Sequence, residues 1–124
     1  MAVATARAAA DLLAPRFAGV EGEKLAVLYL DEEQRTLGIE EHAAASPGAI
    51  DLPLRAIFKR ALALDAAGLV IAHNHPSEDP TPSEADIQAT RRLAATAEAL
   101  GIRLHDHLIF AGGDCFSFRA LGLL

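Results

Sequence analysis

Residues 25–30 and residues 68–72 are hydrophobic or glycine at every position. Residues 25–30 read Leu-Ala-Val-Leu-Tyr-Leu, and residues 68–72 read Gly-Leu-Val-Ile-Ala. Strands that are apolar on both faces lie in the middle of a sheet whose two sides are covered, so both stretches predict central strands. The polar residues 31–34 predict a turn, and residues 35 to about 45 predict a strand that returns beside the first as a hairpin.

Three further segments have the composition or the spacing of helices. Residues 2–17 are rich in alanine and predict the first helix. Pro53 suits the first turn of a second helix, and a third is expected from Ser83 to about Leu100. The positions expected to face the core are Leu54, Ile57, Phe58, Ala61, Leu62 and Leu64 in the second helix and Ile87, Leu93, Ala94, Ala97 and Leu100 in the third.

The order of the elements indicates the fold class. Residues 102–110 and 115–118 predict two more strands, which completes the order α-β-β-α-β-α-β-β. This order predicts an α/β fold with a single mixed sheet and flanking helices. A length of 124 residues suits one domain, and a hydrophobic fraction of 52% is enough for a core without disulfides.

Charge and cysteine content narrow the function classes. The formal net charge is −6, and the 11 basic residues are scattered among 17 acidic ones, which argues against nucleic acid as a partner of this domain alone. The single cysteine, Cys115, permits no intramolecular disulfide and is expected to be a small buried hydrophobe. No apolar run approaches the roughly 20 residues of a membrane helix, so we expect a cytoplasmic protein with no membrane partner.

The chemistry-bearing residues gather around the end of the second apolar strand. His73 and His75 are two residues apart, and side chains at this spacing share one face of a regular strand. Asp86 lies at the start of the helix that follows a proline-rich loop over residues 76–82. Two histidines and one carboxylate, with a fourth position left for water, are typical of a catalytic zinc site.

Asp86 also has a purely structural interpretation. With Ser83 as the N-cap, Asp86 occupies the third helical position and resembles the acidic member of a capping box. The helix dipole favours an acid there in any case. Spacing alone therefore leaves open whether Asp86 is a metal ligand or an ordinary helix cap.

The wider pattern resembles a known family. His73-Asn-His75-Pro, followed by Ser83-Glu-Ala-Asp86, resembles the His-x-His-Pro and Ser-x-x-Asp motif of JAMM (MPN+) metallohydrolases. His-Asn-His-Pro-Ser, Pro-Thr-Pro-Ser, His105-Asp-His107 and the closing Ser117-Phe to Gly122 more narrowly resemble the RadC family. The resemblance runs from about residue 23 to the C-terminus. It divides the chain into an N-terminal helix and linker, 1–22, and a JAMM/MPN-like RadC domain, 23–124, with a cytidine-deaminase-like fold.

The resemblance also implies a zinc ion and roles for two further residues. Glu23 matches the glutamate that acts as general base, and Ser83 matches the serine that donates a hydrogen bond to the developing oxyanion. Glu40 and Glu41 compete with Glu23 for the role of base, and Glu21 is a weaker competitor. The implied reaction is hydrolysis of an amide, peptide or isopeptide bond in an unknown protein or peptide substrate.

A second pair of histidines needs its own interpretation. His105 and His107 are also two residues apart on an expected strand, which permits a second metal site. The alternatives are that they and Asp106 line the cleft or orient the ligands, or that they form only structural hydrogen bonds. Asn74 is expected to point to the face opposite His73 and His75 and to be structural.

Two departures and two rival functions accompany the resemblance. Glu78 stands where RadC proteins often have glycine, which puts loop shape and substrate choice in doubt, and residues 1–22 are too short for a helix-hairpin-helix module.

The main rival is a catalytically silent MPN-type scaffold or interaction module linked to DNA repair. An HNH nuclease is the weaker rival, because that fold spreads its histidines over a ββα unit. Exposed sheet edges permit a homodimer without requiring one.

Overall fold

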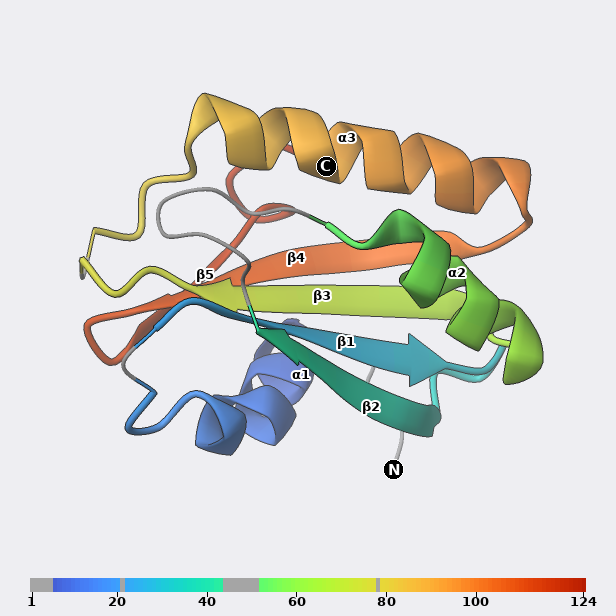
Figure 1. Ribbon diagram of the computed structural model, residues 1–124, viewed down its shortest axis with the longest axis horizontal. Coiled ribbons are helices and arrows are strands. Elements are labelled where there is room, and N and C mark those ends of the chain that lie inside the picture. The colour runs from blue at the N-terminus through green and yellow to red at the C-terminus, as the bar shows by residue number, and fades with distance from the viewer. Residues whose placement is uncertain (1–5, 21, 44–51, 78) are drawn as a thin grey trace.

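The computed structural model describes residues 6–20, 22–43, 52–77 and 79–124, and the chain follows the predicted order of elements (Figure 1). A short 3₁₀ turn, Ala14–Arg16, follows the first helix. The helices and strands are α1 (Ala6–Leu13), β1 (Lys24–Leu30), β2 (Thr36–Ala43), α2 (Leu54–Ala63), β3 (Gly68–Asn74), α3 (Glu84–Ala99), β4 (Arg103–Ala111) and β5 (Asp114–Ser117).

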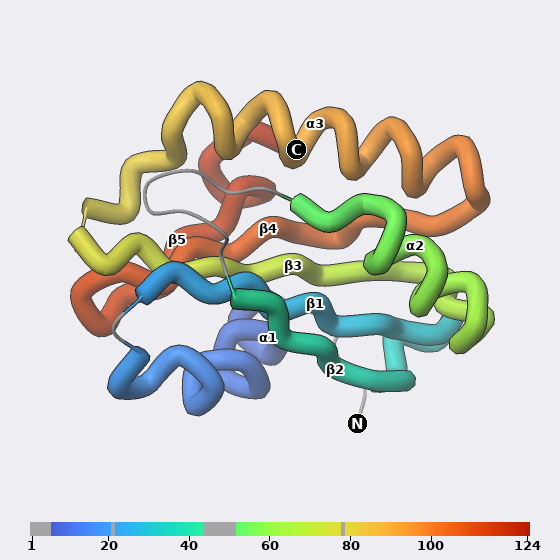
Figure 2. Tube along the Cα trace, in the orientation of Figure 1, coloured from blue at the N-terminus to red at the C-terminus, as the bar shows by residue number. Residues whose placement is uncertain are grey.

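The five strands form one mixed sheet with the order β2-β1-β3-β4-β5. β1 and β2 form the predicted antiparallel hairpin, and β1 also pairs antiparallel with β3. β3 and β4 are parallel, because α3 returns the chain to the same end of the sheet between them, as the trace in Figure 2 shows. Residues 25–30 of β1 and all of β3 are buried, which confirms both as covered central strands.

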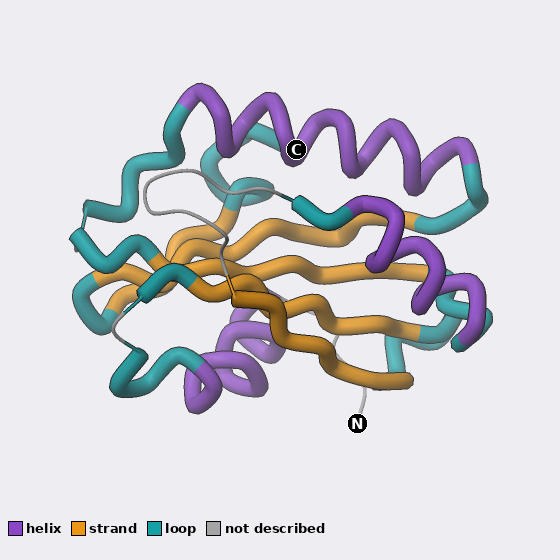
Figure 3. Tube along the Cα trace, in the orientation of Figure 1, coloured by secondary structure: helices purple, strands orange, loops and turns teal. Residues whose placement is uncertain are grey.

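Helices cover both faces of this sheet (Figure 3). α2 and α3 lie on one face, where Ile57 and Leu93 pack with Val27, Ile71 and Leu104 in the larger apolar cluster. α1 lies on the other face, where Ala9 and Leu13 join a second cluster of strand side chains. Successive side chains of β1 and β3 therefore point alternately into the two clusters, as expected for strands that are apolar on both faces.

Three expected core positions are exposed. Leu62 near the end of α2 and Leu100 at the C-cap of α3 are 59% and 45% exposed, because each lies where its helix ends at the rim of the sheet. Cys115 is also exposed, since it lies on β5, a four-residue strand at the edge of the sheet. The prediction that Cys115 is a buried hydrophobe was wrong.

Among the described residues, no helix is both long enough and apolar enough to cross a membrane. The boundary predicted at residue 22 stays a prediction. α1 nevertheless supplies Ala9 and Leu13 to the core of the sheet, so the first helix packs as part of the same folded unit.

Candidate metal centre

The carboxyl end of β3 places two histidines on one face. Leu25 pairs with His73, and Val27 pairs with Ile71, so His73 continues the row of side chains that lies under α2 and α3. The His75 N–H donates to the Phe110 carbonyl at 2.9 Å, which extends the parallel ladder beyond the last residue of β3. The strand therefore remains regular through His75, and the two imidazole rings lie 4.7 Å apart between centroids.

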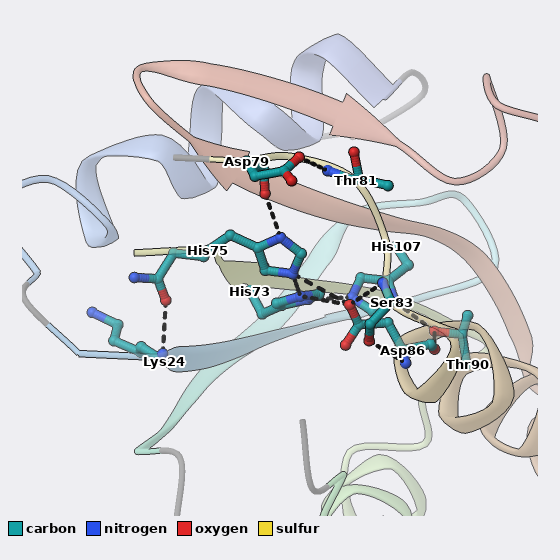
Figure 4. Close-up of polar contacts among 10 residues, drawn as sticks. Lys24, His73, His75, Asp79, Thr81, Ser83, Asp86, Thr90 and His107 are labelled. Atoms are coloured by element: carbon teal, nitrogen blue, oxygen red, sulfur yellow. Dashed lines mark hydrogen bonds and ion pairs between the residues drawn. The ribbon is translucent and has the colours of Figure 1, made fainter. Parts of the chain in front are cut away.

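The first turn of α3 brings a carboxylate to these histidines (Figure 4). Ser83 is the N-cap, and its hydroxyl oxygen accepts from the Asp86 N–H at 3.0 Å. Asp86 Oδ2 accepts from the Ser83 N–H at 2.9 Å, which completes the capping box. The same oxygen lies 3.3 Å from His75 Nε2 and 3.8 Å from His73 Nε2. The capping interpretation and the ligand interpretation are thus compatible, because the cap holds the carboxylate toward the histidines.

Three donor atoms form a compact triangle. The third side, from His73 Nε2 to His75 Nε2, measures 2.8 Å. In a tetrahedral zinc site with bonds of about 2.0–2.1 Å, neighbouring donors are about 3.3–3.4 Å apart, close to the middle of the observed range. Among the described residues, His73, His75 and Asp86 are the one group of histidine, cysteine and acidic side chains close enough to hold a metal ion. Nitrogen and oxygen donors in this ratio suit zinc.

Burial keeps His73 and His107 neutral. Loss of hydration lowers the pKa of His73 to about 4, His75 adds to the lowering, and the Asp86 carboxylate opposes it. Burial likewise holds the pKa of His107 well below its usual range. A neutral imidazole carries a lone pair on one nitrogen, which is the form that binds a metal.

The proline-rich loop fixes the ring of His75. His75 Nδ1–H donates to the Asp79 carbonyl at 2.8 Å, so the lone pair of the neutral ring is on Nε2. The Asp79 carboxylate in turn accepts from the Thr81 N–H at 3.0 Å, which closes a local turn. Sequence reasoning did not single out Asp79, because aspartates that close loop turns are common. Glu78, the departure from the family pattern, lies outside the described residues.

Glu23 lies immediately before β1. Glu23 lies two residues before Leu25, which pairs with His73, so the start of β1 lies beside the end of β3. Its Oε2 atom is buried and has no hydrogen-bond partner among the described residues. Asn74 points to the other face, as expected, and fastens this segment: Oδ1 accepts from the Lys24 N–H at 2.7 Å, and Nδ2 donates to the Gly22 carbonyl at 2.8 Å.

The competing acids are engaged elsewhere. Glu41 lies opposite Ala26, hence on the α1 face, where hydrogen-bonded ion pairs with Lys24 and then with Arg16 lower the pKa of its carboxyl. Glu40 lies opposite Val27, farther along the sheet from His75, and forms an ion pair with Arg60 at 3.2 Å. Glu21 lies outside the described residues.

His105 and His107 do not form a second pair. Leu69 pairs with Leu104 and Val70 with Asp106, so the ladder skips His105 as the extra residue of a β-bulge. The His105 ring lies against Gly68, where a Cβ atom would come within 2.4 Å of its Nε2. The His107 ring points instead to His73, with His107 Nε2 2.6 Å from His73 Nδ1. The bulge breaks the alternation on which the idea of a second metal site depended.

Comparison with known proteins shows the family of this chain. The family described as RadC-like JAB domain matches residues 3–123. The chain belongs to this family. A UPF0758 protein of Rhodobacter capsulatus is 48% identical over 102 residues, 82% of this chain and 48% of that protein. The UPF0758 protein YfjY of Escherichia coli K12 is 40% identical over 124 residues, 100% of this chain and 78% of YfjY.

This RadC-like JAB domain spans about half the length of its Rhodobacter relative and of a UPF0758 protein of Ruegeria pomeroyi that is 45% identical over 104 residues. The resemblance inferred from the sequence motifs is therefore confirmed, as is the α/β fold with one mixed sheet. The RadC-like chain carries a His-His-Asp group that could hold a metal ion.

Proposed function

We propose that this RadC-like chain is a zinc-dependent hydrolase of the JAMM type, which cleaves an amide, peptide or isopeptide bond. The observation that carries the proposal is the convergence of His73 Nε2, His75 Nε2 and Asp86 Oδ2 within 4.8 Å of one another. The Oε2 atom of Glu23, just before β1, supports it further, because this atom is buried and has no hydrogen-bond partner among the described residues. Three donors and a free acid are the protein groups that this chemistry needs.

His73, His75 and Asp86 would hold the zinc ion. When bound, zinc polarises a carbonyl group and lowers the pKa of a water molecule from about 15.7 to near 7. The capping box and the contact of His75 with Asp79 hold two of these ligands in place before any metal arrives. This preorganisation favours binding, because the side chains lose little freedom on meeting the ion.

Glu23 is proposed as the general base that takes the proton of the attacking water and passes it to the leaving amine. Two observations suit this role: Glu23 lies two residues before Leu25, the pairing partner of His73, and its Oε2 atom has no partner within the described part of the chain. An exposed glutamate would be hydrated, whereas a buried oxygen without a partner retains an unused acceptor. Glu40 and Glu41 are held by basic side chains, which makes them weaker candidates.

Ser83 is proposed as the donor to the oxyanion that forms at the substrate carbonyl. Its hydroxyl oxygen already accepts from the Asp86 N–H, and the side chain is exposed at the start of α3. A hydroxyl that accepts one hydrogen bond still has its own hydrogen to donate. Ser83 therefore combines the helix cap with a free donor beside Asp86.

The experiment uses the full chain loaded with one equivalent of zinc and a panel of peptides joined by α-amide and lysine isopeptide bonds. Hydrolysis by the wild type that disappears in Glu23→Gln, with zinc still bound, supports the proposal. Glu41→Gln is the matched control and retains the activity. Activity that survives Glu23→Gln makes Glu23 the wrong base.

A silent scaffold is the alternative function. A chain that binds no zinc and cleaves none of the peptides would support it, and homodimer formation through a sheet edge would then be the next property to measure. The filled ligand positions favour the hydrolase, since a scaffold does not need converging metal donors.

A further inference from the structure

A buried chain of polar contacts starts at His73 and ends at the backbone of Asp86, the residue whose side chain completes the candidate metal group (Figure 4). His73 Nδ1 lies 2.6 Å from His107 Nε2. His107 Nδ1 lies 2.6 Å from the hydroxyl oxygen of Thr90. The Thr90 hydroxyl lies 2.7 Å from the Asp86 carbonyl oxygen. The proposed reaction uses neither His107 nor Thr90.

The last contact fixes the direction of all the others. A carbonyl oxygen only accepts, so the Thr90 hydroxyl donates its hydrogen to Asp86. Thr90 must then accept from His107, which places the His107 hydrogen on Nδ1 and its lone pair on Nε2. His107 Nε2 can only accept from His73, so the hydrogen of His73 is on Nδ1. The lone pair of His73 is left on Nε2, which faces the other two donors.

The surroundings leave this chain no alternative partner. His107 is 0% exposed and Thr90 is 1% exposed, so water does not compete for their hydrogen bonds. The His107 ring stacks on Phe118 with centroids 4.3 Å apart and planes at 16°, which opposes rotation of the ring. Reversing one hydrogen bond would leave a buried polar atom unpaired, which is unfavourable.

The two histidines of the candidate metal group are thereby oriented by separate partners. Asp79 sets the lone pair of His75 on Nε2, and the buried chain sets that of His73 on Nε2. The two nitrogens are 2.8 Å apart, and Asp86 Oδ2 lies 3.3 Å from one of them. Three electron-rich atoms at this separation repel one another, and a cation between them removes the repulsion.

We propose that His107 and Thr90 are positioning residues that fix the tautomer of His73 and so prepare its Nε2 atom to bind the metal ion. The proposal rests on the metal site of the proposed function. It extends that site to β4 and to the second turn of α3, where a hydroxyl and a buried imidazole act through His73. Partners of this kind typically change metal affinity by about 10–100-fold when removed.

The test compares Thr90→Val with Thr90→Ser in the full chain. Valine has nearly the shape of threonine but removes the hydroxyl, whereas serine keeps it. We expect the zinc dissociation constant, measured by competition with a chelator near pH 7, to rise about 10–100-fold in Thr90→Val and to stay within about threefold of wild type in Thr90→Ser. Equal affinity in Thr90→Val and wild type would overturn the proposal.

A second measurement reads the tautomer directly. Nitrogen-15 spectra of the imidazole rings distinguish a hydrogen on Nδ1 from one on Nε2, in protein with or without zinc. We expect Nδ1–H for both His73 and His107 in the metal-free wild type, and a mixture at His107 in Thr90→Val. Nε2–H at His73 in the wild type would refute the proposal, even if zinc binds.

The two hypotheses fail in different ways. If the wild type binds no zinc, the proposed hydrolase fails, and the nitrogen-15 spectra still decide whether the buried chain orients His73. If the wild type binds zinc but Thr90→Val binds it equally well, the hydrolase stands and the positioning role fails.

Discussion

Two His-X-His tripeptides lie on neighbouring parallel strands of this sheet, yet their histidines behave differently. In His73-Asn74-His75 the strand is regular, and both imidazoles reach the same metal group. In His105-Asp106-His107 the bulge at His105 sends one ring to Gly68 and the other to His73. Equal spacing in the sequence therefore gives a shared face only where the ladder is unbroken.

The middle residues of the two tripeptides have a common role. Asn74 uses its amide group to hold Gly22 and Lys24 on either side of Glu23. Asp106 uses its carboxylate to accept from the N–H groups of His107 and Arg119 and from the Ser117 hydroxyl. Each polar side chain hydrogen-bonds to backbone groups of a neighbouring segment. Each thereby fastens a chain segment that the sheet itself does not hold.

The largest expected difference between the tripeptides is in metal binding. We expect His73→Ala to abolish zinc binding at micromolar protein concentration and His105→Ala to keep one zinc ion per chain, because only His73 contributes a donor to the group. Loss of one of three protein ligands typically weakens binding by orders of magnitude. Zinc content after dialysis measures the effect. Equal zinc content in the two variants would contradict the claim that His73 binds the metal and His105 does not.

The next largest effect concerns the middle residues. Asp106 is buried and accepts three hydrogen bonds, so Asp106→Ala leaves buried donors unpaired and should lower the free energy of unfolding by about 2–4 kcal/mol. Asn74→Ala breaks two hydrogen bonds and should cost about 1–2 kcal/mol. Urea denaturation of the metal-free proteins compares them. A smaller loss for Asp106→Ala than for Asn74→Ala would contradict this ranking.

Acid should destabilise the metal-free protein through His73 and His107. Their pKa values in the folded state are lowered, to about 4 for His73, whereas unfolded histidine has a pKa of about 6.5. The unfolded chain therefore binds more protons between these values, and stability present above pH 6.5 is lost as the pH falls toward 4. We expect a loss of about 1–3 kcal/mol, measured by urea denaturation from pH 7 to 4.5. Unchanged stability over this range would show that these rings are not held neutral.

The smallest effect tests the position of His105. A Cβ atom at Gly68 would lie 2.4 Å from His105 Nε2, so Gly68→Ala forces that partly exposed ring to move. We expect a loss of about 1 kcal/mol in the wild-type background and a smaller loss in a His105→Ala background. Thermal or urea denaturation of the four proteins in this cycle gives the coupling. Equal losses in both backgrounds would mean that the ring does not lie against Gly68.

Much of the fold was predictable from periodicity, because β1 and β3 are apolar on both sides and bounded by turn residues. Leu62 and Leu100 show the limit of that reasoning, since helical spacing does not reveal where a helix passes the rim of the sheet. Spacing made His73 and His75 candidate ligands, and the resemblance to the JAMM motif added Asp86. A regular strand followed by a capped helix brings the three together.

The remaining features of the site depend on contacts between distant residues. No residue of β4 marks the bulge at His105, which arises from the pairing of β3 with β4. The choice of Glu23 as base depends on the family resemblance alone. Asn74, which lies 51 residues away in the sequence, bonds the residues on either side of Glu23, and no local pattern predicts that contact. The partnership of Thr90 with His107 joins a helix to a strand and leaves no local pattern.

X-ray absorption at the zinc edge tests the central hypothesis most directly, using the full chain loaded with one equivalent of zinc. The structure predicts four nitrogen or oxygen donors at about 2.0–2.1 Å, of which two are imidazoles. Three imidazoles would mean that His107 binds the ion itself, and a sulfur donor would implicate Cys115. Six oxygens without imidazole would mean that His73, His75 and Asp86 do not hold zinc. That result would contradict the metal site on which the proposed hydrolase depends.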